Sequence, residues 1–278
     1  DAGTGTLDAA TNNTGLGHEV FDDLTSGDNN TGVGMQALTK LTTGSQNTAM
    51  GALALDANTT ADNNTAVGYN ALTGNTTATA NTAVGSQAAD ALTEGQFNTA
   101  IGHTALGADT LGSHSVALGY GALTTQNFTT ATNAFNTALG NNALYANTTG
   151  TSNTAAGYAA LDANTTGGSN VAVGRDALGA NTTADANTAL GYGSLRDNTT
   201  GSGNVGLGYL ALEENTTGGN NTAVGFEALE ENTTASNNTA VGYQTLAANT
   251  TGAQNTAVGG YALDANTTAG NNTAIGYS

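Results

Sequence analysis

The chain is marked first by the residues that it lacks. Its 278 residues include no cysteine, no proline and no tryptophan. Without cysteine there are no disulfides, and the redox compartment cannot be inferred from the sequence. The absence of proline suits regular backbone ladders, because every backbone N–H remains available as a hydrogen-bond donor.

Basic residues and long apolar runs are also scarce. Only Lys40, Arg175 and Arg196 oppose 21 acidic residues, which gives a net charge of -18. Such a chain is repelled by nucleic-acid phosphates and by anionic membranes, so we expect neither as a partner. No apolar run is long enough to cross a bilayer, and no signal peptide is recognisable, so we expect no membrane insertion by this segment.

What the chain does contain is a 17-residue repeat, of which Asn64 to Ala80, NTAVGYNALTGNTTATA, is a representative copy. One step is 21 residues long, which places a four-residue insertion within residues 126–135. The sixteen copies begin at Asn13, Asn30, Asn47, Asn64, Asn81, Asn98, Ser115, Asn136, Asn153, Asn170, Asn187, Asn204, Asn221, Asn238, Asn255 and Asn272.

The pattern within the repeat predicts the fold. The fifth position is always Gly, the fourth is mostly aliphatic and the ninth is mostly Leu, as in Val67, Gly68 and Leu72. One unit cannot bury its apolar side chains, whereas stacked units can. We therefore predict an all-β fold, a parallel β-solenoid of about sixteen 17-residue coils in which the aliphatic groups are sheltered by neighbouring coils.

The domain organisation follows from the repeat. We expect a partial coil over residues 1–12, solenoid coils over 13–125, a loop insertion over 126–135, and coils of the same elongated domain over 136–278. The chain begins and ends within a repeat. This predicts either a segment of a longer protein or subunits that stack head to tail.

The segment SHSVALGYGAL, Ser113 to Leu123, resembles the head repeat of trimeric autotransporter adhesins. The NTAVGYxAL units are also similar to NTAxGYxAL repeats of bacterial surface and phage tail-fibre-like proteins. The resemblance covers about half of each unit and recurs along the chain. It implies a left-handed β-roll assembled as a homotrimer, although the coil here is longer, with Asn-Thr-Thr inserted opposite the Gly turn.

The twelfth position offers candidate modification sites. Its Asn opens N-T-T, the acceptor pattern for N-glycosylation in a secreted protein. The alternative is a plain turn, since Asn/Thr-rich repeats create this pattern by chance. The candidates are Asn58, Asn75, Asn147, Asn164, Asn181, Asn198, Asn215, Asn232, Asn249 and Asn266; Asn12, Asn29, Asn63, Asn127, Asn220, Asn237 and Asn271 fit the pattern too.

The sixth position offers a candidate interface stripe, because a side chain directly after the Gly bend is expected to leave the narrow core. We expect burial between subunits, with Tyr stacking on sugar rings or simple packing over the coil edge as alternatives. The stripe comprises Tyr69, Tyr120, Tyr158, Tyr192, Tyr209, Tyr243 and Tyr277, with Met35, Phe226, His18 and His103 at the same position.

Other polar groups predict structure rather than chemistry. The first-position Asn residues are expected to stack as an amide ladder. Loop carboxylates such as Asp56 and the pairs Glu213-Glu214 and Glu230-Glu231 could bridge coils through calcium, but no known calcium motif is present and solvated charge is the simpler interpretation. The histidines have no metal-ligand spacing. We expect no cofactor, no metal and no catalytic residue, hence no enzyme.

These observations predict an extracellular, cell-surface structural or adhesive fibre that binds through repeated surfaces rather than a pocket. Its first partner would be itself, as a homotrimer or a head-to-tail filament, and carbohydrate or a host cell surface is a further candidate. A self-polymerising, glycan-coated filament is the alternative. An ice-binding solenoid, suggested by the regular Thr pairs, is a third possibility.

Overall fold

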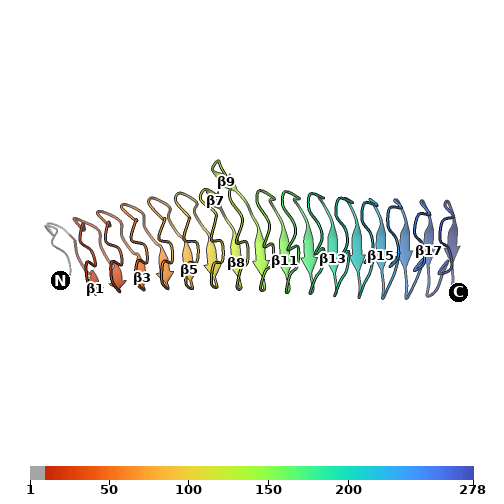
Figure 1. Cartoon of the computed structure of the whole chain (residues 1–278), viewed down its shortest axis with the longest axis horizontal. Coiled ribbons are helices and arrows are strands. Elements are labelled where there is room, and N and C mark those ends of the chain that lie inside the picture. Colours follow the sequence, from red (N-terminus) through yellow and green to blue (C-terminus); the bar gives the residue numbers. More distant parts are fainter. Residues whose placement is uncertain (1–9) are drawn as a thin grey trace. The chain divides into compact units, whose positions relative to one another are not determined.

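A computed structural model describes residues 10–278, and it confirms the predicted parallel β-solenoid. Most of the partial coil expected over residues 1–12 lies outside the described residues. The chain divides into two compact units, the first ending at Ala138 and the second beginning at Leu139. In each unit, short strands follow one another at the repeat interval and belong to successive coils (Figure 1). Residues 10–278 contain no helix that is long and apolar enough to span a bilayer.

The first unit contains one strand per repeat and an extra pair of strands. Neighbouring coils pair in parallel and in chain order, from β1 through β6 to β8. The strands are β1 (Thr14–Leu16), β2 (Thr31–Val33), β3 (Thr48–Met50), β4 (Thr65–Val67), β5 (Thr82–Val84), β6 (Thr99–Ile101), β7 (Gly112–Ser113), β8 (Val116–Leu118) and β9 (Thr132–Asn133); β10 (Thr137–Leu139) runs across the unit boundary.

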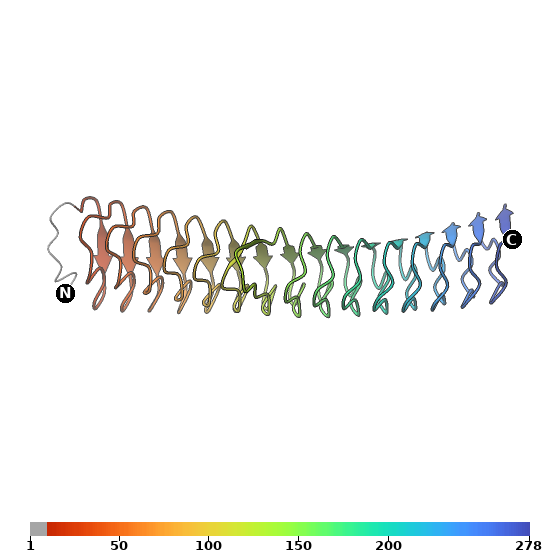
Figure 2. The same cartoon turned by 90° about the horizontal axis from the view of Figure 1, so that it is seen from above.

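The second unit repeats the same arrangement with no extra strand among β11 to β18. Each strand again pairs in parallel with the next along the chain. These strands are β11 (Thr154–Ala156), β12 (Val171–Val173), β13 (Thr188–Leu190), β14 (Val205–Leu207), β15 (Thr222–Val224), β16 (Thr239–Val241), β17 (Thr256–Val258) and β18 (Thr273–Ile275). Seen from above, the strand arrows within each unit form a row (Figure 2).

Within each unit the fifth-position glycines form a file, in which a glycine packs on the glycine of the next coil. Gly34 has φ +131°, in the region that L side chains rarely adopt, and a Cβ there would lie 2.6 Å from the carbonyl oxygen of Gly51. The N–H of Gly51 donates to the carbonyl of Val33 at 2.8 Å. Glycine is therefore required twice, by the backbone conformation and by the contact between coils.

The core is built from small residues and leucine. Within a coil such as that of Asn64, the buried side chains are Ala66, Ala71, Leu72 and Ala78, together with two asparagines. Leu72 adopts a left-handed conformation with φ +53°, and equivalent leucines do the same in most coils. The left-handed conformation is unfavourable for leucine, so the side chain holds this turn because its burial outweighs the backbone cost.

The expectation that the fourth-position aliphatics are sheltered in the core is wrong. Successive side chains of a strand point to opposite faces, so an inward third-position Ala turns the fourth position outward. Leu190 is 50% exposed, and none of the fourth-position residues appears among the buried core residues. Leu118 and Val258 are also exposed.

The insertion lies where the sequence predicts it, in a loop of one coil of the first unit. Thr132 and Asn133 pair in parallel with Gly112 and Ser113 of the preceding coil, so part of the loop adds a second short ladder. In Figure 1 the loop that carries β9 extends beyond the neighbouring coils. Gln126 and Phe128, at its beginning, point into the core and are buried.

Candidate interaction surfaces

The outward side chains of the strands form a surface that we call the strand face. It consists of the second and fourth positions of each repeat, for example Thr65 and Val67, which flank the buried Ala66. The parallel register pairs like with like, Thr65 with Thr82 and Val67 with Val84. Each unit therefore carries a row that is mostly threonine beside a row that is mostly aliphatic, with strands about 4.8 Å apart.

The strand face carries no negative charge, although the chain is strongly acidic. Every carboxylate within residues 10–278 lies between the seventh and sixteenth positions of its repeat, in the turns and loops away from the strand. The segment from the seventeenth position to the sixth, which contains the strand, holds a single arginine, Arg175. An uncharged face on a chain of net charge -18 is the surface on which two copies would repel each other least.

Six consecutive sixth-position side chains of the second unit form what we call the aromatic column: Tyr158, Arg175, Tyr192, Tyr209, Phe226 and Tyr243. The ring centroids of Tyr209 and Phe226 are 5.1 Å apart with planes 10° from parallel, and Phe226 and Tyr243 are 5.2 Å apart at 8°. Arg175 lies between Tyr158 and Tyr192, with its Cζ 5.8 and 5.7 Å from their centroids. The coil repeat thus stacks these side chains on one another.

This geometry argues against tyrosines of the column stacking on sugar rings. The two faces of Tyr209 are covered by Tyr192 and Phe226, at 5.3 and 5.1 Å between centroids. Only ring edges and hydroxyl groups remain to face a partner, and a sugar that stacks on an aromatic ring needs the face. The other stripe residues lie elsewhere in the repeat series: Tyr120 stacks on His103, Tyr277 meets Tyr261 edge to face, and Tyr69 is exposed.

The first-position asparagines form the expected amide ladder inside the solenoid. Asn64 is buried; its Oδ1 accepts the backbone N–H of Asn81 at 2.9 Å, and its Nδ2 donates to the carbonyl of Ala78 at 2.9 Å. The same two hydrogen bonds recur at Asn47, which accepts from Asn64 at 3.0 Å and donates to Ala61 at 2.8 Å. Each side chain thus ties its own coil to the next and closes the loop opposite the strand.

The twelfth-position asparagines, which the sequence offers as glycan carriers or as plain turn residues, are buried, and those of the second unit form a second ladder. In the second unit, Asn164 Nδ2 donates to Asn147 Oδ1 at 2.9 Å and to the Gly167 carbonyl at 3.0 Å, and its Oδ1 accepts from Asn181 at 2.8 Å. The glycan would have to be attached to this nitrogen. The coil-to-coil ladder runs through Asn147, Asn164, Asn181, Asn198, Asn215, Asn232, Asn249 and Asn266, all fully buried except Asn266, which is partly exposed. In the first unit Asn58 and Asn75 are also fully buried, but each bonds within its own loop, with Ala61 and Ala78 respectively.

The asparagines that fit the N-glycosylation pattern outside the twelfth position are all exposed. They occupy the seventeenth position, directly before the buried first-position Asn, except for one in the insertion loop. They are Asn12, Asn29, Asn63, Asn127, Asn220, Asn237 and Asn271, and all seven are exposed. A glycan on the folded chain would therefore fit beside the strand face or on the insertion, whereas a fully buried N-T-T asparagine could carry one only by giving up its hydrogen bonds.

The tenth position carries one group of charged contacts in the second unit, apart from the Arg175–Asp176 ion pair at the sixth and seventh positions. Arg196 forms ion pairs with Asp197 at 3.0 Å and with Glu213 of the next coil. Burial raises the pKa of Glu213 more than Arg196 lowers it. One coil further on, burial and the carboxylates of Glu227 and Glu213 raise the pKa of Glu230 to about 7. Glu230 is therefore partly protonated at neutral pH, which relieves repulsion along this row.

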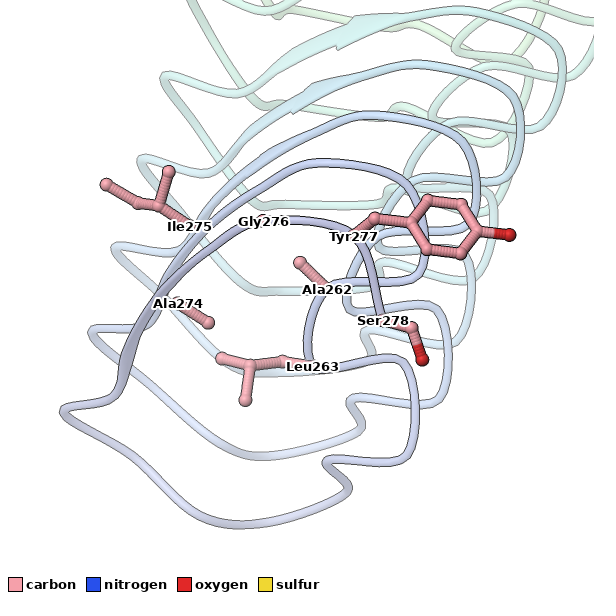
Figure 3. A pocket seen from close by; sticks show the side chains of 7 residues that line it. All are labelled: Ala262, Leu263, Ala274, Ile275, Gly276, Tyr277 and Ser278. Carbon is pink, nitrogen blue, oxygen red and sulfur yellow. The ribbon is translucent and has the colours of Figure 1, made fainter.

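The described residues offer few features that are typical of enzymes or metal proteins. Across residues 10–278, no three His, Cys, Asp or Glu side chains gather closely enough to hold a metal ion. A hollow of about 320 Å³ lies at the end of the second unit, between Leu263, Ala274 and Tyr277 (Figure 3). Leu263 and Ala274 occupy positions that are fully buried in inner coils, so this hollow is an uncovered slice of the core.

Sequence reasoning found the repeat positions and expected the sixth position to leave the core, but it wrongly assigned the outward fourth-position aliphatics to the core. It left the twelfth-position Asn open between a glycan carrier and a plain turn residue. Strand alternation could have placed Val67 outward, because Thr65, Ala66 and Val67 cannot all face the core. The local sequence gives no comparable signal for Asn75, since a turn asparagine can point either way. No family model matches the chain, and no curated protein matches it either.

Proposed function

We propose that this protein is a structural and adhesive module of an extracellular fibre, without enzymatic activity, that binds through repeated surfaces rather than through a pocket. Stacked coils with buried amide ladders supply rigidity, and outward side chains supply the same contacts again and again. The extracellular, cell-surface location rests on the resemblance of the repeat to adhesin heads.

The partner that we propose first is a second copy of the same chain, bound through the strand face. The observation that carries this proposal is the absence of carboxylates from that face in a chain of net charge -18. Exposed Leu190, Met50 and Leu118 there add apolar area that association would remove from water. A lateral homotrimer and a filament of laterally joined copies could both use such a face.

Analytical ultracentrifugation at increasing protein and salt concentration tests the proposal. We expect oligomers that become more stable as salt screens the acidic loops, because the contact itself is uncharged. The variant Val67→Glu with Val84→Glu places two charges on the strand face and should abolish oligomers. The matched control, Thr43→Glu with Thr60→Glu, adds the same charge to exposed loop positions and should leave most oligomers intact.

Two results would refute self-association through the strand face: a monomer at every concentration and salt condition, or equal loss of oligomers in the two double variants. Electron micrographs of the wild-type oligomers would then separate closed particles from continuous fibres. Fractionation of the producing cells would test the location, since a cytoplasmic protein contradicts the proposal.

Ice binding is the second candidate, and the structure gives it a specific observation. The outer face of each unit carries threonine rows at two positions, in the strands as at Thr65 and in the loops as at Thr60 and Thr77. The thirteenth-position threonine of the same loop is already engaged: the Thr42 Oγ1 donates to the Thr59 carbonyl of the next coil at 2.9 Å. Its hydroxyl therefore ties neighbouring coils together. Thermal hysteresis of the purified protein is the test, and its absence removes this candidate.

A further inference from the structure

Three departures from the repeat meet at one buried place in the first unit. The first position is Asn in every repeat except one, where it is Ser115. The twelfth position is Asn or Leu except in two adjacent coils, where it is Asp109 and Gln126. These three side chains are fully buried, as is Asn136 of the following coil.

The four side chains are connected by hydrogen bonds. Gln126 Nε2 donates to Asp109 Oδ2 at 2.7 Å and to Ser115 Oγ at 3.0 Å. Asn136 Nδ2 donates to Gln126 Oε1 at 2.8 Å. The other oxygen of Asp109 accepts the backbone N–H of Gly112 at 3.0 Å, with the N–H of Phe128 further away at 3.4 Å.

This arrangement brings together the parts of an acyl-transfer site whose substrate is the protein itself. The Gln126 carboxamide is an acyl group, and its carbonyl oxygen already receives the donor, from Asn136, that would stabilise an oxyanion. The Ser115 Oγ lies 3.0 Å from Gln126 Nε2. That nitrogen is bonded to Gln126 Cδ, the carbon that the hydroxyl would attack, so the two reacting groups are already neighbours. A carboxyl group lies against the departing nitrogen.

We propose that Ser115 and Gln126 form an intramolecular ester that cross-links the first and twelfth positions of their coil. The Ser115 Oγ–Gln126 Cδ bond forms and the Cδ–Nε2 bond breaks. The hydroxyl proton ends on the nitrogen, which leaves as ammonia. The step consumes no oxidant, reductant or cofactor.

The remaining groups fit this chemistry. Asp109 lies where a general acid would assist the departing nitrogen, and burial raises its pKa, so its protonated form persists to higher pH than for an exposed aspartate. Burial also keeps bulk water away from the ester once it has formed. The bond would close the coil immediately before the insertion, where the regular first-position and twelfth-position ladders are interrupted.

Mass spectrometry of the full-length protein tests the proposal. We expect the denatured wild-type chain to be lighter than its sequence by one ammonia. Chymotrypsin cleaves after Tyr120, between the two residues, so the peptides that contain Ser115 and Gln126 should remain joined. Hydroxylamine at alkaline pH, which cleaves esters, should separate them.

Two of the matched variants, Ser115→Asn and Asp109→Asn, use residues that other copies of the repeat carry at the same position. Ser115→Asn restores the asparagine of the other coils and should keep the full mass, whereas Ser115→Thr retains a hydroxyl and should still lose ammonia. Asp109→Asn should slow the loss by about a hundredfold or more, in line with the usual contribution of general acid catalysis. Circular dichroism of each variant checks that the solenoid has formed.

The proposal is overturned if the folded wild-type protein, incubated for days, yields Ser115 and Gln126 on separate unmodified peptides. It is also overturned if Ser115→Asn loses the same ammonia, because the loss would then come from another amide. Neither result depends on whether the protein forms fibres.

Discussion

Replacement of Asn164 by alanine would test whether the buried twelfth-position ladder stabilises the solenoid. Asn164 is fully buried and takes part in three side-chain hydrogen bonds, to Asn147, Gly167 and Asn181, between 2.8 and 3.0 Å long. Alanine removes all three and leaves a space in the buried interior.

The expected cost follows from these contacts. A net hydrogen bond contributes about 1 kcal/mol, so three bonds account for roughly 3 kcal/mol. Asn181 keeps a second acceptor, the Ala184 carbonyl at 3.2 Å, which limits the penalty on that side. The Gly167 carbonyl also accepts from Asn153 at 2.8 Å, so it keeps a donor. We therefore expect a loss of about 3 to 4 kcal/mol in the free energy of unfolding.

Denaturant unfolding followed by circular dichroism measures the total loss, and hydrogen exchange over residues 160–170 locates it, since a solenoid coil depends mainly on its neighbours. Asn164→Asp separates hydrogen bonding from the cavity, because it keeps the volume but cannot donate when ionised; its loss should be larger at pH 7 than at pH 4. Thr166→Ala, on the exposed side of the same loop, should change stability by less than about 0.5 kcal/mol. A loss below about 1 kcal/mol for Asn164→Ala would refute the reasoning.

Three further outcomes are expected. Gly68→Ala should cost at least about 2 kcal/mol of unfolding free energy, because φ is +141° and the added Cβ would lie 2.6 Å from the Gly85 carbonyl carbon. The control Gly179→Ala should cost far less, because the atom nearest to its added Cβ would be 3.4 Å away. Leu72→Ala should cost about 2 to 4 kcal/mol, measured in the same way, since the side chain is fully buried. Glu230→Gln should stabilise the protein by on the order of 1 kcal/mol at pH 8 and should have no effect on stability at pH 4. The pKa of Glu230 is about 7 in the folded protein and lower in the unfolded chain, so the wild type loses stability as the pH rises from the unfolded pKa to the folded pKa. Partial exposure of Glu230 to solvent weakens this effect. Equal effects at both pH values would contradict the assigned cause.

The repeat made the fold predictable because its regularity reports a backbone requirement. A glycine at Gly34, Gly68 and every equivalent position predicts either a positive φ or a close approach between coils, and both are found. The spacing of the main strands followed directly, since one of them begins at the second residue of each repeat, whereas the extra pair β7 and β9 was not predicted. The insertion was equally plain, because it breaks an otherwise constant interval.

The sidedness of polar and aliphatic residues was harder to predict, because composition points the wrong way. Val67 is apolar and faces outward, whereas Asn64 and Asn75 are polar and fully buried. Burial of an amide is favourable only when each donor and acceptor finds a partner. A single repeat does not reveal those partners, since the acceptor for Asn164 is Asn147, which occupies the same repeat position one coil earlier.

The buried asparagines occupy interior positions that large apolar residues would otherwise fill, so a departure from the repeat at such a position changes the hydrogen bonds of the interior. In the second unit the twelfth-position ladder joins the same side chain in consecutive coils, because each Asn is the acceptor of the next. In the first unit Ser115, Gln126 and Asp109 replace that pattern with a group of different side chains that satisfy one another's hydrogen bonds. In a strictly repeated core, three coordinated departures that place a hydroxyl, an amide and a carboxyl in contact therefore indicate a local chemistry that the other coils do not have.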